Sequence, residues 1–134
     1  MFDWDRMLAF DGNTAPYLQY AHARICSIFR RAEVDRADVP GNPITLEADQ
    51  ERVLAKRLLG YPTALAETLA TYSPHKLANY LFDLAQDFTA FYEHCPVMRA
   101  DEPLRSSRLA LCDLTARTLE HGLGLLGIEA PESM

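Results

Sequence analysis

Residues 12–24 read Gly-Asn-Thr-Ala-Pro-Tyr-Leu-Gln-Tyr-Ala-His-Ala-Arg, and this stretch predicts the beginning of a long helix. Asn13 or Thr14 is a suitable N-cap, because its side-chain oxygen can accept a hydrogen bond from a free backbone N–H. Pro16 then falls in the first turn, where its missing N–H costs no hydrogen bond. We expect the helix to continue to about Glu33.

The two tyrosines of this stretch are its main candidates for function. Residues three apart are neighbours on a helix surface, so Tyr17 and Tyr20 are expected side by side, with Arg24 one turn beyond Tyr20. Two rings and a guanidinium on one stripe can receive unpaired nucleotide bases by stacking. They can equally be half-buried core rings with hydroxyls at the surface, and composition alone favours that interpretation.

The remainder of the chain also has a helical pattern. Residues 35–43 combine prolines and a glycine with charged residues and are expected to form a loop. The expected helices begin near Thr14, Thr45, Pro62, Pro74 and Leu104.

Three further boundaries follow from the same signals. Gly60 is expected to end the second helix, and Cys95 is expected to end the helix that begins at Pro74. Residues 130–134 are expected outside the last helix. No alternating strand pattern of useful length occurs. The sequence therefore predicts an all-α fold, an antiparallel bundle of about five main helices with a short extra turn at the N-terminus.

Composition favours one soluble globular domain over residues 1–134. The hydrophobic fraction is 49% and the mean hydropathy is -0.15. No apolar run reaches the roughly 18 residues needed to span a membrane. The N-terminus does not resemble a signal peptide, so a cytoplasmic location is expected. An odd count of three cysteines, all in apolar surroundings, predicts buried, inert thiols.

The charge distribution limits how the chain can bind nucleic acid. A formal net charge of -6 argues against a general polyanion binder. Residues 1–36 nevertheless hold five acidic residues against five arginines, so this part is the least acidic. Contact with a nucleic acid is therefore expected to be local, through a few arginines and aromatic rings.

No constellation of residues predicts catalysis or metal binding. The four histidines are well separated, and the Cys-x-x-Cys, His-x-x-x-His and Glu-x-x-His spacings of metal sites are absent. No cysteine lies at a predicted helix N-terminus, and no glycine-rich phosphate loop occurs. We therefore expect no catalytic residue, no metal and no cofactor in this chain.

Several segments resemble one family when they are taken together and in order. Besides residues 12–24, they are Phe-Asp-Trp-Asp at 2–5, Asn-Tyr-Leu-Phe-Asp-Leu-Ala at 79–85, Phe-Tyr-Glu-His-Cys-Pro-Val at 91–97 and Leu-Gly-Ile-Glu-Ala-Pro-Glu-Ser-Met at 126–134. The chain resembles, over nearly its whole length, the C-terminal anticodon-binding domain of arginyl-tRNA synthetase, a class I synthetase.

The resemblance implies a set of RNA-binding residues. Tyrosines at the matching places of the family contact splayed bases of the anticodon loop, which implies this role for Tyr17 and Tyr20. Tyr92 and Met134 also match family positions near that loop. Gln19 and Arg24 lie close by in the sequence and are candidates for hydrogen bonds.

The resemblance also implies partners and limits. The partners are the anticodon loop of tRNA-Arg and the catalytic domain of the parent synthetase, with neither a membrane nor DNA expected. ATP and Mg would be bound by the parent catalytic domain, whose signature motifs are absent here. The chain is therefore expected to be a fragment that does not catalyse arginylation alone. The alternative is a free-standing helical protein–protein interaction domain of the same fold.

Overall fold

The computed structural model describes the backbone of residues 4–134 and the side chains of residues 14–134. Within that range the chain is helical and contains no strand, which confirms the all-α prediction. Five α-helices and one short 3₁₀ helix occur in the order α1 (Trp4–Ala32), η1 (Arg36–Asp38), α2 (Asp49–Leu59), α3 (Tyr61–Thr71), α4 (Pro74–His94) and α5 (Leu104–Leu125).

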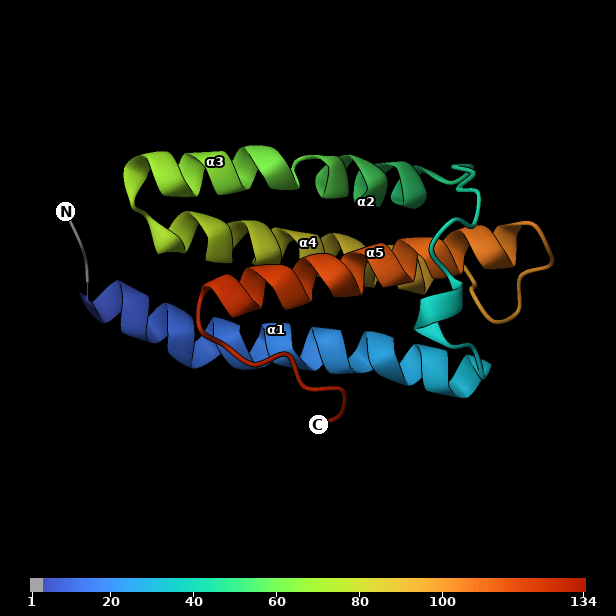
Figure 1. Cartoon of the computed structure of the whole chain (residues 1–134), viewed down its shortest axis with the longest axis horizontal. Coiled ribbons are helices and arrows are strands. Elements are labelled where there is room, and N and C mark those ends of the chain that lie inside the picture. The colour runs from blue at the N-terminus through green and yellow to red at the C-terminus, as the bar shows by residue number, and fades with distance from the viewer. Residues whose placement is uncertain (1–3) are drawn as a thin grey trace.

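The helices form an antiparallel bundle (Figure 1). Helices α2 and α3 follow one another along one edge, α1 lies along the opposite edge, and α4 and α5 lie between them. α4 contacts every other α-helix, and α1 packs against both α4 and α5. The tail that follows α5 returns across α1 (Figure 1).

α4 supplies the centre of the core. Its apolar residues recur at steps of three and four, which places them on one face of the helix. Leu81, Leu84, Phe88 and Phe91 are fully or almost fully buried, as this spacing predicts. Gly122 of α5 lies against Leu81 so closely that a Cβ atom would come within 2.7 Å of the leucine methyl carbons. A side chain at this position would displace the buried Leu81 side chain.

The predicted start of the first helix was wrong. α1 begins at Trp4 and passes through Pro16 without ending, so neither Asn13 nor Thr14 is an N-cap. Residues 4–12, which precede the predicted start, form no turn separate from α1; Trp4 and Asp5 belong to this helix, whereas Phe2 and Asp3 of the matching segment lie outside the described residues. A proline within a helix removes one hydrogen bond to the residue four positions earlier. Packing of the following turns against α4 and α5 outweighs that local signal.

The start of the second helix was also wrong. α2 begins at Asp49 and not near Thr45, which is still in the preceding loop. The cap is formed by Glu51, whose Oε1 accepts a hydrogen bond of 2.9 Å from the backbone N–H of Ala48. The backbone N–H of Thr45 instead donates to Ser107 Oγ of α5 at 2.8 Å, which fixes this loop to the bundle.

The remaining boundaries confirm the predictions. Gly60 ends α2, Pro62 and Pro74 lie in the first turns of α3 and α4, and Cys95 ends α4. The tail, residues 126–134, follows the end of α5 as an irregular segment. None of the helices within residues 4–134 combines the length and the apolar character needed to cross a membrane.

The three cysteines are free and buried, as predicted. Burial raises the pKa of the Cys112 thiol and, to a smaller extent, that of Cys95. Both thiols are therefore poor nucleophiles at neutral pH.

Candidate nucleic-acid interface

An arginine and a tyrosine from different helices meet on the surface of the bundle. The guanidinium carbon of Arg24, on α1, lies 5.3 Å from the ring centroid of Tyr92, on α4. The Tyr92 ring is stacked on the buried Phe88 ring, with centroids 6.0 Å apart and planes 12° from parallel. Tyr92 is only partly buried. The structure thus brings together two predicted RNA-binding residues, and Phe88 fixes the plane of the tyrosine ring.

A second arginine approaches the same tyrosine. Arg31 is exposed, and its Nη2 donates a hydrogen bond of 3.4 Å to the Tyr92 hydroxyl. Arg31 lies seven residues after Arg24, which places both guanidinium groups on one stripe of α1. The sequence prediction omitted Arg31, although this spacing would have identified it.

The two tyrosines of α1 have different surroundings. The Tyr17 ring is half-buried and packs against Phe82 of α4, with centroids 5.2 Å apart. Tyr20, three residues later on the same stripe, is 56% exposed. Tyr17 therefore has one ring surface in contact with the protein, as the core interpretation predicts, whereas most of the Tyr20 ring is open to a ligand. We call Tyr17, Tyr20, Arg24 and Arg31 the α4 edge of α1.

Another stripe of α1 holds the tail in place. Three side chains hydrogen-bond to tail carbonyl groups: Gln19 Nε2 to Glu129 at 3.0 Å, His22 Nδ1 to Pro131 at 2.8 Å and Arg30 Nη1 to Glu132 at 2.9 Å. Figure 1 shows the tail crossing α1. We call Gln19, His22 and Arg30 the tail edge of α1. Met134, two residues beyond the last of these bonds, is 71% exposed.

Gln19 and Met134 therefore differ from the other predicted site residues. The Gln19 amide is already engaged with the tail, so its place is on the tail edge and not beside Tyr92. Met134 is exposed at the end of a segment that is fixed to α1 only as far as Glu132. The structure thus groups Arg24 and Tyr92, leaves Tyr20 and Met134 exposed, and gives Gln19 a structural partner.

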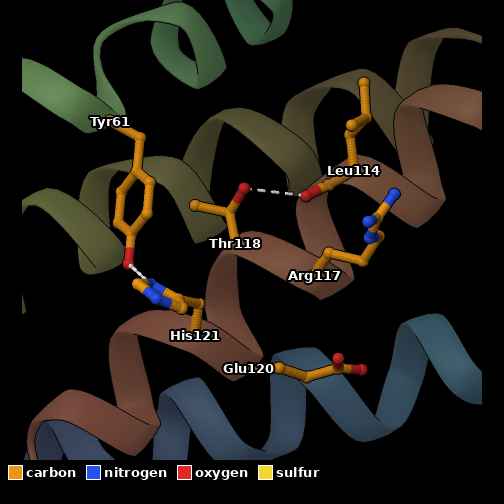
Figure 2. A pocket seen from close by; sticks show the side chains of 6 residues that line it. All are labelled: Tyr61, Leu114, Arg117, Thr118, Glu120 and His121. Atoms are coloured by element: carbon orange, nitrogen blue, oxygen red, sulfur yellow. Dashed lines mark hydrogen bonds between the residues drawn. The ribbon is translucent and has the colours of Figure 1, made fainter.

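An open pocket lies elsewhere, between α3 and α5 (Figure 2). The Tyr61 hydroxyl and His121 Nδ1 are 2.5 Å apart in it, and Arg117, Thr118 and Glu120 complete its polar lining. None of the predicted RNA-binding residues lines this pocket. Within the described part of the chain, no group of three or more His, Cys, Asp or Glu side chains is arranged to hold a metal ion.

Comparison with known proteins identifies a matching family. The family model described as "DALR anticodon binding domain" matches residues 18–134, which include α1 from its second half, the tail and Tyr92. The fold and the surface described above define a class of protein, a helical bundle that carries aromatic and basic side chains on one face. Within that class, the chain belongs to the DALR anticodon-binding domain family.

The similar proteins are arginyl-tRNA synthetases. The chain is 56% identical to an arginine–tRNA ligase from Thermobifida fusca over 100% of its own length and 23% of that protein. It is 50% identical, with the same coverage, to an arginine–tRNA ligase from Escherichia coli. The structure of Thermus thermophilus arginyl-tRNA synthetase aligns with 99% of the chain at a TM-score of 0.81 and 42% identity. The chain spans about a quarter of the length of these relatives.

Proposed function

We propose that this chain is the domain by which an arginine–tRNA ligase recognises the anticodon loop of tRNA-Arg. The observation that supports the proposal most directly is the contact between Arg24 and Tyr92, which unites residues 68 positions apart in the sequence on one surface. Tyr20 and Arg31 extend this surface along α1, and Met134 supplies an exposed apolar side chain at the end of the tail.

The chemistry of these side chains suits an unpaired loop. Bases splayed out of an RNA loop stack on aromatic rings, at roughly 1–3 kcal/mol per base. Arg24 and Arg31 provide positive charge for the adjacent phosphates, although the chain has a net charge of -6. Every arginine codon has G at its centre, so every cognate anticodon has C there. Hydrogen bonds to the pairing edge of that base would select cytosine.

In this proposal, catalysis takes place in another part of the parent protein. We propose that ATP and Mg are bound by a catalytic domain outside these residues and that this chain holds no cofactor. The parent would act in the cytoplasm, with tRNA and its own catalytic domain as partners and without DNA or a membrane. In a full-length ligase that carries this domain, Tyr92→Ala should raise the apparent KM for tRNA-Arg and leave adenylate formation intact.

Titration with short RNA hairpins tests the proposal. The chain is titrated at moderate salt with the anticodon stem-loop of tRNA-Arg, carrying either C or U at the central position. We expect the C-containing hairpin to bind about tenfold more tightly, equivalent to about 1.4 kcal/mol. Equal affinity for both hairpins would refute the proposed specificity.

A matched pair of tyrosine variants tests where the hairpin binds. Tyr20→Ala should weaken binding, whereas Tyr72→Ala should leave it unchanged. Tyr72 is 92% exposed at the end of α3 and so is an equally accessible tyrosine on another surface. A loss of affinity that is equal for the two variants would show that exposed aromatic residues bind the RNA without a specific site.

An exposed apolar surface favours the alternative, a protein–protein interaction domain. Leu59, the last residue of α2, and Leu69 of α3 are 81% and 73% exposed, and the exposed Tyr72 follows directly after α3. Large apolar side chains exposed in this way mark surfaces that bind another protein when they form one patch. Light scattering coupled to size exclusion tests this second function. A stable dimer that Leu69→Ser dissociates, together with absence of RNA binding, would favour it over anticodon recognition.

A further inference from the structure

His22 is a buried histidine between two hydrogen-bond partners from distant parts of the chain. Its side chain is 1% exposed. Nδ1 lies 2.8 Å from the carbonyl oxygen of Pro131 in the tail, and Nε2 lies 2.7 Å from Oε1 of Glu120 on α5. The imidazole thereby connects α1, α5 and the tail at a single point.

Both partners of His22 are acceptors. A backbone carbonyl has no hydrogen to donate. Glu120 Oε1 also accepts a hydrogen bond of 2.6 Å from Arg36 Nη1, and this ion pair and the bond from His22 lower the pKa of Glu120 despite its partial burial. The carboxylate is therefore ionised at neutral pH. Because neutral imidazole carries only one N–H, both bonds can form together only when His22 is doubly protonated.

The charges of the four inner groups, His22, Arg36, Glu120 and Asp113, balance when the imidazole is protonated. Glu120 and Asp113 face the cluster from α5, and Arg36 of η1 pairs with both carboxylates, at 2.6 Å and 2.9 Å. Arg117 reaches the rim, 3.9 Å from Asp113. Cys26 lies one turn along α1, with Sγ 3.9 Å from both ring nitrogens. Two carboxylates thus surround His22 and Arg36, and a neutral imidazole would leave the inner cluster with a net negative charge.

These surroundings shift the pKa of His22 upward. Burial alone would lower it, but hydrogen bonding to Cys26, Glu120 and Pro131 outweighs that effect and raises the pKa to about 9. The stability that protonated His22 contributes to the folded state is fully present below the ordinary histidine pKa of 6.5. It is lost as the pH rises through about 9.

We infer that protonated His22 is a positioning residue that fixes the tail on α1, and that its deprotonation at alkaline pH loosens the tail. Gln19 and Arg30, the other two residues of the tail edge, hold the tail from more exposed positions. His22 is the buried member of the three, between them in the sequence. Its effect on RNA binding, through the position of Ser133 and Met134, rests on the proposed function.

Two NMR measurements on the whole chain in the absence of RNA test the tail contact. The first uses ¹⁵N labelling of histidine side chains. We expect both ring nitrogens of His22 to be protonated at pH 7 and one of them to lose its proton near pH 9. This readout assigns the titration to the imidazole and not to Cys26. A neutral His22 at pH 7 would overturn the inference.

The second measurement follows the tail through the labelled methyl group of Met134, one of four methionines. We expect its signal to move and sharpen between pH 7 and pH 10 with the same midpoint as His22. Glu120→Gln retains an acceptor oxygen but removes the charge, so the midpoint should fall by roughly one pH unit. His94→Gln is the matched control, since His94 is exposed and bonds only to the carbonyl of Ala90 in its own helix. An unchanged midpoint in Glu120→Gln would overturn the inference.

A third variant connects the tail to RNA binding. His22→Gln should give a Met134 signal that is already mobile at pH 7 and should weaken hairpin binding roughly tenfold, the equivalent of one hydrogen bond to a charged group. Circular dichroism establishes whether the variant folds, and Glu120→Gln above pH 8 replaces it if it does not. A released tail with unchanged affinity would refute the positioning role. Absence of binding by the unsubstituted chain would refute the proposed function and leave the tail measurements valid.

Discussion

The two edges of α1 show how one helix uses similar side chains in two different ways. On the tail edge, Gln19, His22 and Arg30 each bond to a carbonyl group of residues 129–132. On the α4 edge, Tyr20 and Arg31 remain exposed. Arginine occurs on both edges, so residue type alone does not indicate which side chains are available for a ligand. Their availability depends on whether a distant segment of the chain has already bound them.

The largest effect on stability is expected from breaking the charged cluster that includes His22 of the tail edge, together with Arg36, Glu120 and Asp113. Asp113→Ala removes a carboxylate that is 4% exposed and pairs with Arg36 at 2.9 Å. Because this leaves a partly buried guanidinium with one fewer counter-charge, we expect the free energy of unfolding to fall by about 3 kcal/mol. Urea denaturation at pH 7 measures the change.

Asp83→Ala is the control for this substitution. Asp83 is 51% exposed and lies 4.0 Å from Arg57. An exposed pair at this distance contributes little, so the free energy of unfolding should change by less than about 0.5 kcal/mol. Similar losses in both variants would show that the charged cluster at the tail edge has no special structural importance.

The second effect concerns the α4 edge and its partner on α4. Tyr92→Ala should weaken hairpin binding by about 2 kcal/mol, since it removes a stacking platform and the ring beneath Arg24. Tyr92→Phe should retain most of the affinity, because only the bond from Arg31 to the hydroxyl is lost. Fluorescence anisotropy with labelled hairpin measures both. Equal losses for the two variants would indicate that the hydroxyl, and not the ring surface, carries the interaction.

The third effect is a dependence of stability on pH, which is caused by His22 of the tail edge. The pKa of His22 is raised, so the folded state binds this proton more tightly than the unfolded state does. Stability should therefore decrease as the pH rises from 7 to 10, by roughly 2–3 kcal/mol from this group. Thermal unfolding of the chain and of His22→Gln measures it. A decrease of the same size in both would assign it to other groups.

The smallest effect is expected from the exposed arginines. Arg31→Gln should weaken binding of all hairpins equally, whatever their central base, and should reduce the salt dependence by about one ion. Arg99→Gln, at an exposed residue in the loop after α4, is the comparison and should change neither quantity. If the loss in Arg31→Gln depended on the central base, Arg31 would be reading sequence and not holding a phosphate.

Much of the fold could be predicted from local chemistry. Pro62, Pro74 and Gly60 lie where the rules for helix ends place them, and the apolar spacing of α4 identified the centre of the core. The error at Pro16 arose because a signal typical of a first turn is also tolerated inside a helix that tertiary contacts stabilise. For α2, Thr45 was an acceptable cap by residue type, but Glu51 forms the actual cap from within the helix.

The candidate site was predictable only in part. Arg31 shares a helical stripe with Arg24, so spacing could have identified it. The contacts of the tail could not be predicted in this way, because each one joins a side chain of α1 to a backbone carbonyl about 100 residues away. A backbone carbonyl is present at every residue and so leaves no pattern in the sequence.

Mapping the hairpin on the chain by NMR shows directly whether the RNA binds at the α4 edge of α1. The anticodon stem-loop of tRNA-Arg is added to ¹⁵N-labelled protein, and the shift of each backbone amide is followed. We expect the largest changes around Tyr20, Arg24, Tyr92 and Met134, and none around Tyr72 at the end of α3. Changes concentrated on α2 and α3, with the α4 edge unaffected, would contradict this expectation.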